Sequence, residues 1–179
     1  MEHNEQIRWR TVRPEEAQML APWRKIGGEW MLLTAGDGAG YNTMTASWGH
    51  IGSLWGHGGG LPTAIAYVRP QRYTKEFLDR AGLYTLSFFP AEYKKALGYL
   101  GSHSGRDGDK VAAAGLTPVF GERCTWFEEA SLVLVCRKLY QAPLVEEGFV
   151  DKSIIEECYP HRDYHQMYIG EVVQVLEKG

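Results

Sequence analysis

The stretch that decides the fold runs from Tyr41 to Thr74 and reads YNTMTASWGHIGSLWGHGGGLPTAIAYVRPQRYT. Its first part, 41–48, alternates small hydroxyl side chains with larger ones, as in a strand that lets a flat ligand lie close to its backbone. Its last part contains an apolar, β-branched and aromatic run, 62–68, that is typical of a second strand. The sequence therefore predicts two strands that flank a glycine-rich loop.

A pair of arginines, Arg69 and Arg72, follows the second of these strands. The apolar spacing in 77–81, closed by Gly82, predicts a helix that starts near Thr74. Guanidinium groups donate two hydrogen bonds to phosphate at once, and the first turn of a helix offers unpaired N–H groups at the positive end of its dipole. The combination is suited to a phosphate group.

The rest of the chain predicts a mainly β fold. The runs that read as strands, at least six in all, are 29–35, 43–49, 62–68, 84–89, 132–136 and 168–176. The run 132–136 is continuously apolar, which indicates a central strand. Two more short helices are predicted, one from Pro90 and one through 111–114. Because neither a βαβ rhythm nor a GxGxxG after a strand is present, a small β-barrel with short peripheral helices fits better than a Rossmann domain.

Composition narrows the class of protein. A chain of 179 residues is within the range of one domain, so we expect a single domain over 1–179. Nineteen Lys and Arg against 22 Asp and Glu make a formal net charge of −3, and no long basic run offers a track for nucleic acid. The sequence has neither a signal-peptide pattern at its start nor an apolar run long enough to cross a bilayer, which predicts a cytoplasmic location. Cys124, Cys136 and Cys158 are odd in number and lack CxxC spacing, so we expect reduced thiols.

Four motifs occur in order along the chain: NTMTASW at 42–48, RPQRYT at 69–74, SGRDGDK at 104–110 and YIGEV at 168–172. Together they resemble the flavin reductase-like, FMN-binding split-barrel family, nearest its flavoredoxin branch, and the match extends over about 25–176. The resemblance implies a homodimer of six-stranded split β-barrels. It also implies noncovalent FMN near the subunit interface, reduced by NAD(P)H or by a redox protein as electron donor.

The family pattern, carried over motif by motif, predicts the site residues. It would place the isoalloxazine ring along Met44, Thr45, Ala46, Ser47 and Trp48. It would place the phosphate on Arg69, Arg72, Tyr73 and Thr74, and would bring to the edge of the cofactor, from the same or the second subunit, Ser104, Arg106, Asp107 and Lys110. Donors fixed near N1 and O2 of the ring favour the reduced flavin, and an aromatic side chain can cover part of the ring. The Gly58–Gly60 triplet departs from the family pattern and leaves the shape of the substrate entrance open.

Each motif also has a purely structural interpretation. Taken singly, 43–48 could be an ordinary edge strand, the two arginines surface ion-pair donors and 105–107 a solvated turn that caps a helix. A C-x2-H-x-D-x-H pattern is formed by Cys158, His161, Asp163 and His165. These are transition-metal ligands by type, but no helix fixes their geometry, so we expect no metal there.

The sequence leaves three functions to compare. The first is an FMN-dependent oxidoreductase of the flavin reductase type that passes electrons onward. The second is a flavin-binding electron carrier without its own nicotinamide site, and the third is a flavin-free binding domain. No catalytic dyad is apparent, so we assign no catalytic side chain and expect the cofactor to supply the chemistry.

Overall fold

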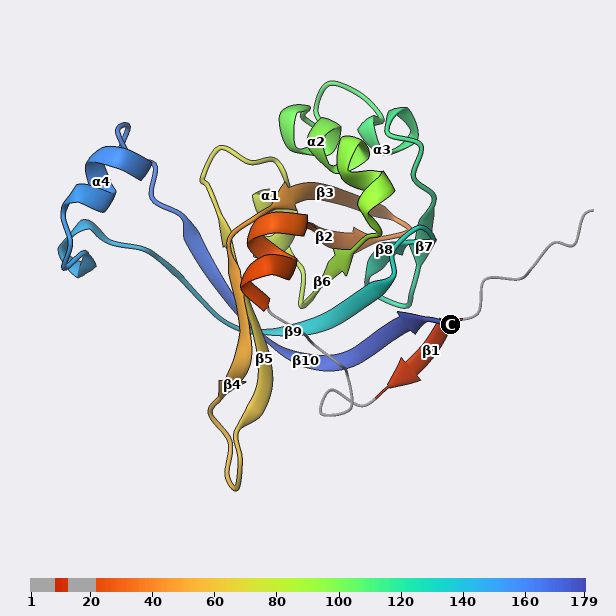
Figure 1. Cartoon of the computed structure of the whole chain (residues 1–179), viewed down its shortest axis with the longest axis horizontal. Helices are drawn as coiled ribbons and strands as arrows, with labels where there is room; N and C mark the ends of the chain where they lie inside the picture. Colours follow the sequence, from red (N-terminus) through yellow and green to blue (C-terminus); the bar gives the residue numbers. More distant parts are fainter. Residues whose placement is uncertain (1–8, 13–21) are drawn as a thin grey trace, which may run out of the picture.

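The computed structural model describes residues 9–12 and 22–179, and Figure 1 shows its arrangement. Within these residues, eight strands form one antiparallel sheet in the order β3-β2-β6-β9-β10-β5-β4, with β1 paired to β10. The strands of this sheet are β1 (Trp9–Val12), β2 (Met31–Asp37), β3 (Gly40–Ala46), β4 (Gly49–Leu54), β5 (Leu61–Val68), β6 (Leu83–Phe88), β9 (Leu132–Pro143) and β10 (Gln166–Lys178). A separate pair is formed by β7 (Pro118–Phe120) and β8 (Thr125–Phe127).

The helical elements are short and lie around the sheet. They are η2 (Arg24–Glu29), α1 (Thr74–Arg80), η3 (Ala91–Tyr93), α2 (Lys94–Ser102), α3 (Lys110–Ala113), η4 (Glu146–Gly148) and α4 (Ser153–Cys158). The three helices predicted from sequence correspond to α1, η3 with α2, and α3. The sequence did not predict η2 or α4. No helix of the described residues is long and apolar enough to cross a membrane.

All six predicted strands are present, and the mainly β prediction is confirmed. The runs 29–35 and 43–49 correspond to β2 and β3, which form a hairpin. Its turn requires Gly36, whose φ is +98° and where a Cβ would lie 2.2 Å from the carbonyl oxygen of Gly40. The run 132–136 is central, because β9 pairs with both β6 and β10. The prediction missed β4, since the 49–54 segment that forms it is rich in glycine and largely exposed.

Two apolar clusters bury both faces of the sheet. The inner cluster surrounds Tyr84, whose hydroxyl donates to the carbonyl oxygen of Ala64 at 2.9 Å. Gly170 makes room for this ring, because a Cβ there would lie 2.6 Å from the Tyr84 hydroxyl oxygen. The outer cluster lies under α2 and α3 and includes Leu97 and Phe127. Both faces are buried along 31–35 of β2 and 132–136 of β9, and this explains why these segments are almost entirely apolar, with Thr34 as the exception, rather than alternating.

Two extensions project from this barrel. The α4 arm, which we define as residues 144–165, is carried by the far ends of β9 and β10, and the β4–β5 hairpin projects in another direction (Figure 1). The glycine triplet lies at the tip of this hairpin, where Gly58, Gly59 and Gly60 all have positive φ. It therefore shapes the tip of an extension, and no tip residue lines the hollows described below.

Candidate functional site

A polar groove opens where the end of β3 approaches the end of β5. Its first part, the arginine hollow, measures about 230 Å³ and is lined by Met44, Thr45, Ala46, Ser47, Trp48, Tyr67, Arg69, Arg72 and His165. The adjoining part, the loop hollow, measures about 330 Å³ and is lined by Asn42, Met44, Gln71, Arg72, Tyr73, Thr74, Ser102, His103, Ser104, Gly105 and Lys110. The two parts share Met44 and Arg72. The groove thus brings together eleven of the thirteen residues predicted from sequence, all except Arg106 and Asp107.

The hydroxyl groups of β3 do not all face the groove. The Thr43 hydroxyl is buried against that of Thr34 at 2.8 Å, and the Thr45 hydroxyl donates to the carbonyl oxygen of Leu97 in α2 at 2.5 Å. Ser47 lines the arginine hollow and makes no hydrogen bond through its hydroxyl within the described part of the chain. Of the three hydroxyls at 43, 45 and 47, only that of Ser47 is therefore without a hydrogen-bond partner in the described residues, because the packing of α2 on β3 engages Thr45.

The two arginines differ in their partners. Arg69 forms an ion pair with Asp163 at 2.6 Å and donates to the carbonyl oxygen of Cys158 at 2.7 Å. Arg72 donates to the carbonyl oxygen of Gly101 at 2.8 Å and has no carboxylate within ion-pair distance among residues 22–179. The charge of Arg69 is therefore compensated within the chain, whereas that of Arg72 is available to an anion.

Lys110 adds a second cation without a carboxylate partner in the described structure. Its side chain is buried, and its Nζ donates to the carbonyl oxygens of Leu100 and His103 at 3.1 and 2.9 Å. Burial, and then the positive charge of Arg72, lower the pKa of Lys110 to about 8. Two cations that disfavour each other in a half-enclosed hollow are an arrangement that an anion would stabilise.

Tight packing shapes the loop hollow. The Thr74 hydroxyl is buried and accepts a hydrogen bond from the side-chain amide of Asn42 at 2.7 Å. A Cβ at Gly105 would lie 2.1 Å from the Oδ1 of Asn42, so the 102–105 segment can close over this pair only with glycine there. Tyr73 has its ring under the guanidinium group of Arg106 at 4.4 Å.

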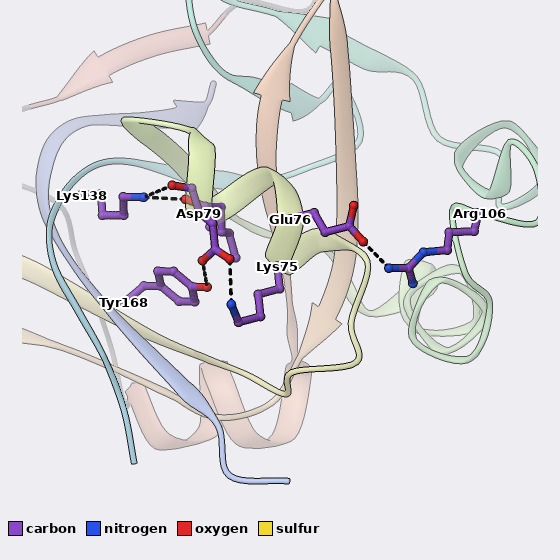
Figure 2. A network of polar contacts seen from close by, with 7 residues as sticks. Lys75, Glu76, Asp79, Arg106, Lys138 and Tyr168 are labelled. Carbon is purple, nitrogen blue, oxygen red and sulfur yellow. Dashed lines mark hydrogen bonds and ion pairs between the residues drawn. The ribbon is translucent and has the colours of Figure 1, made fainter. Parts of the chain in front are cut away.

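Arg106 and Asp107 lie outside the groove within one copy of the chain. Arg106 pairs with Glu76 of α1 instead (Figure 2). Asp107 lies in a turn, in which its N–H donates to the carbonyl oxygen of Ser104 at 3.2 Å. Asp109, two residues later, caps α3. Within one copy of the chain these residues form an exposed turn before α3, and a contact with the cofactor of a second subunit stays a prediction.

Polar contacts with β9 and β10 anchor the C-terminal end of helix α1. Figure 2 shows Asp79 between Lys75 and Tyr168, which it binds at 2.7 and 2.6 Å, and Lys138 at the last carbonyl groups of the helix. The expectation of unpaired first-turn N–H groups is wrong for two of them, because the N–H groups of Lys75 and Glu76 donate to the carbonyl oxygens at 72 and 73. The helix therefore holds the 72–74 segment in place rather than presenting a row of free donors.

An apolar hollow of about 440 Å³, the aromatic hollow, adjoins the arginine hollow and shares Ser47, Trp48 and Tyr67 with it. Its remaining walls come from η2, the start of β4 and the α4 arm: Trp23, Ile26, Gly27, Gly49, His50, Leu144, Phe149, Ile154 and Tyr159.

The residues of the aromatic hollow that come from the arm were not predicted from sequence, because no local pattern brings the arm to the end of β3. His165 was also not predicted as a groove residue and was considered only as a metal ligand. Within the described residues no group of three or more His, Cys, Asp or Glu side chains is placed to hold a metal ion.

Comparisons with known proteins agree with this architecture. Residues 23–179 match the family described as the flavin reductase like domain. A structure of an FMN-binding domain of a flavin reductases-like enzyme from Shewanella baltica is 16% identical, with a TM-score of 0.65 over 96% of this chain and 78% of that one. Flavoredoxin from Methanosarcina acetivorans is 20% identical, with a TM-score of 0.61 over 84% and 68%. A structure from Shewanella frigidimarina described as having a split barrel domain is 20% identical, with a TM-score of 0.61 over 85% and 69%. At such identities the likeness concerns the fold, and the split-barrel prediction is confirmed; a search of curated proteins found no match.

Proposed function

Because the chain belongs to the flavin reductase-like domain family, we propose that it is an oxidoreductase that holds FMN noncovalently in the polar groove. The observation that carries the proposal is the groove itself. Small residues at the end of β3 line one half of it, and two cations without a carboxylate partner in the described residues border the other half. A flat ring with an anionic tail has this distribution of polarity.

The residues of the groove fit the two ends of FMN. The phosphate carries close to two negative charges near neutral pH, and Arg72 and Lys110 would hold it together with the hydroxyl of Ser104. Ala46 and Ser47 would leave room for the ring, and Trp48 would cover part of it. Arg69 contributes indirectly, because its ion pair with Asp163 ties the α4 arm to the wall of the arginine hollow.

Bound FMN would supply the hydride and electron chemistry, and the chain would bind it, orient it and limit its access to water. We favour NAD(P)H as the electron donor. The aromatic hollow supports this choice, since it adjoins the arginine hollow and offers Trp48, Tyr67 and Phe149 as surfaces for a second flat ring. The alternative, a flavin-binding carrier that receives electrons from a redox protein, uses the same groove without a nicotinamide site.

Mixing experiments separate these two functions. The purified protein, loaded with FMN, should lose its yellow absorbance rapidly on anaerobic addition of NADH or NADPH. Bleaching by dithionite or by a reduced redox protein, but by neither nicotinamide, would support the carrier. A protein that binds neither FMN nor riboflavin in a fluorescence-quenching titration would contradict the proposal as a whole.

We also propose that the protein is a homodimer, with an interface of roughly 2,000 Å² or more in total, as in obligate dimers. Large apolar side chains that are exposed on the two extensions and beside η2 support it. Val150 on the α4 arm is fully exposed, and Trp55 at the hairpin tip and Trp23 beside η2 are 49% and 79% exposed. A monomeric mass by light scattering at micromolar concentration would contradict it.

A cytoplasmic location is proposed from the three free cysteines, which fit a reducing compartment.

A further inference from the structure

His165 is a buried polar residue of the arginine hollow that the proposal above does not yet use. It precedes β10 at the base of the α4 arm, and only 8% of its surface is exposed. Its Nδ1 lies 2.8 Å from the hydroxyl oxygen of Tyr159, and the ring of Trp48 is tilted against it with centroids 4.9 Å apart. The imidazole is thus held on two sides, by a tyrosine of the same arm and by a tryptophan that follows β3.

The partner of Nδ1 decides which nitrogen carries the proton. A phenol titrates near pH 10 and is a far stronger acid than a neutral imidazole N–H, so the Tyr159 hydroxyl donates and Nδ1 accepts. The proton of a neutral His165 then lies on Nε2. Nε2 makes no hydrogen bond within the described residues, although the ring lines the arginine hollow.

The surroundings of His165 keep it neutral. Burial, and then the positive charge of Arg69, lower its pKa to about 4, with Arg72 acting in the same direction and Asp163 against it. These are the charged groups that face it from the end of β5, from α1's leading turn and from the arm. The neutral imidazole of His165, with Arg69 and Arg72 nearby, can donate a hydrogen bond to a ligand atom that carries partial negative charge.

We propose that His165 binds the isoalloxazine ring as a neutral donor through Nε2, and that Tyr159 is the positioning residue that sets its tautomer. This inference rests on the proposed function, because it assumes that the ring occupies the arginine hollow. It also gives three of the four residues in the Cys158–His165 motif a role that needs no metal. The carbonyl oxygen of Cys158 and the carboxylate of Asp163 hold Arg69, and His165 faces the groove.

The tautomer can be measured in the wild-type protein without flavin. Long-range ¹H–¹⁵N spectra of histidine-labelled protein between pH 6 and 8 should show His165 with an unprotonated Nδ1 and a protonated Nε2. Tyr159→Phe keeps the ring that packs against Phe149 and Tyr164 but removes the hydroxyl, so it should yield a mixture of tautomers. Tyr164→Phe is the matched control on the same arm, since its hydroxyl bonds Glu146 and Arg162 and not His165. A protonated Nδ1 in the wild type would overturn the proposal.

Flavin binding tests the role of the tautomer. His165→Leu should weaken FMN and riboflavin by the same factor, about 3- to 10-fold, since one hydrogen bond to the shared ring is lost. His165→Gln, whose amide nitrogen can replace Nε2, should recover part of the affinity, and Tyr164→Phe should change nothing. If His165→Leu binds both flavins as tightly as the wild type, or loses affinity for FMN alone, the inference fails while the proposed function stands. If the wild type binds no flavin, the proposed function fails and the spectra alone test the tautomer.

Discussion

The barrel and the α4 arm use the same kinds of residue in opposite ways. The barrel buries its large apolar side chains on both faces of the sheet, whereas the arm leaves Val145, Val150 and Ile154 exposed. The arm instead buries polar groups at its base, where His165 and Asp163 meet Arg69 from the end of β5. The comparison teaches that the barrel is stabilised by packing, while the arm is held to it by a few directed polar contacts next to the groove.

The largest expected effect is a loss of stability in the barrel. Leu86 is fully buried in β6, so Leu86→Ala should lower the free energy of unfolding by about 2 to 5 kcal/mol, through lost burial and the cavity left behind. Val145→Ala in the arm, where the side chain is about half exposed, is the matched control and should change it by less than about 0.5 kcal/mol. Urea denaturation followed by circular dichroism measures both. Equal losses in the two variants would remove the distinction between barrel and arm.

A smaller effect separates the two arginines. Arg72→Ala should reduce FMN affinity by about 1.5 to 3 kcal/mol, roughly 10- to 150-fold in dissociation constant, because a charge-assisted hydrogen bond to the phosphate is lost. Riboflavin, which lacks the phosphate, should hardly be affected. Fluorescence-quenching titrations at low and raised salt measure the difference and its electrostatic character. If both flavins weaken equally, Arg72 supports the barrel; if neither does, Lys110 becomes the better candidate for the phosphate.

Acid should weaken the arm before the barrel. The pKa of His165 is lowered to about 4 in the folded protein. Between pH 6.5 and 4 its imidazole is therefore protonated in the unfolded chain and largely neutral in the folded protein. The contribution of His165 to stability is therefore complete above pH 6.5 and should be reduced by roughly 2 to 3 kcal/mol when the pH reaches 4. Asp163, whose pKa is lowered to about 2 by hydrogen bonds from Gln71 and Arg69, adds a loss only below about pH 4. Thermal unfolding at a series of pH values should show a flatter profile between 6.5 and 4 for His165→Gln, and an unchanged profile would contradict this assignment.

The smallest effect concerns a residue that the sequence placed in the site. Arg106 pairs with Glu76 at the surface, with about half of each side chain exposed. Arg106→Ala should therefore change the free energy of unfolding and the affinity for FMN by less than about 0.5 kcal/mol. A large loss of FMN affinity, at a concentration where light scattering detects a dimer, would show that Arg106 reaches the cofactor of a second subunit.

Local pattern explains what could be predicted from sequence. The six strands follow from runs of apolar, β-branched and aromatic residues, and the β2–β3 turn follows from glycine at 36. The motifs at 42–48 and 69–74 converge because β3 and β5 end at the same side of the barrel. In contrast, β4 lacks the apolar alternation of a half-buried strand, and nothing in the arm indicates that Phe149 and Tyr159 reach the groove.

By itself, the sequence determined the mainly β fold, the position of the arginine pair after a strand and the family to which the chain belongs, since these depend on residues close together along the chain. Only the tertiary structure decided what each side chain does. From sequence, Arg69 and Arg72 are equivalent candidates for binding a phosphate. In the structure, Arg69 forms an ion pair with Asp163 on the arm, whereas Arg72 donates to the carbonyl oxygen of Gly101. His165 was predicted from sequence only as a possible metal ligand, yet a tyrosine of its own arm and a tryptophan that follows β3 hold it at the groove. Charge compensation and burial depend on contacts between residues far apart in the chain, and only folding brings those residues together.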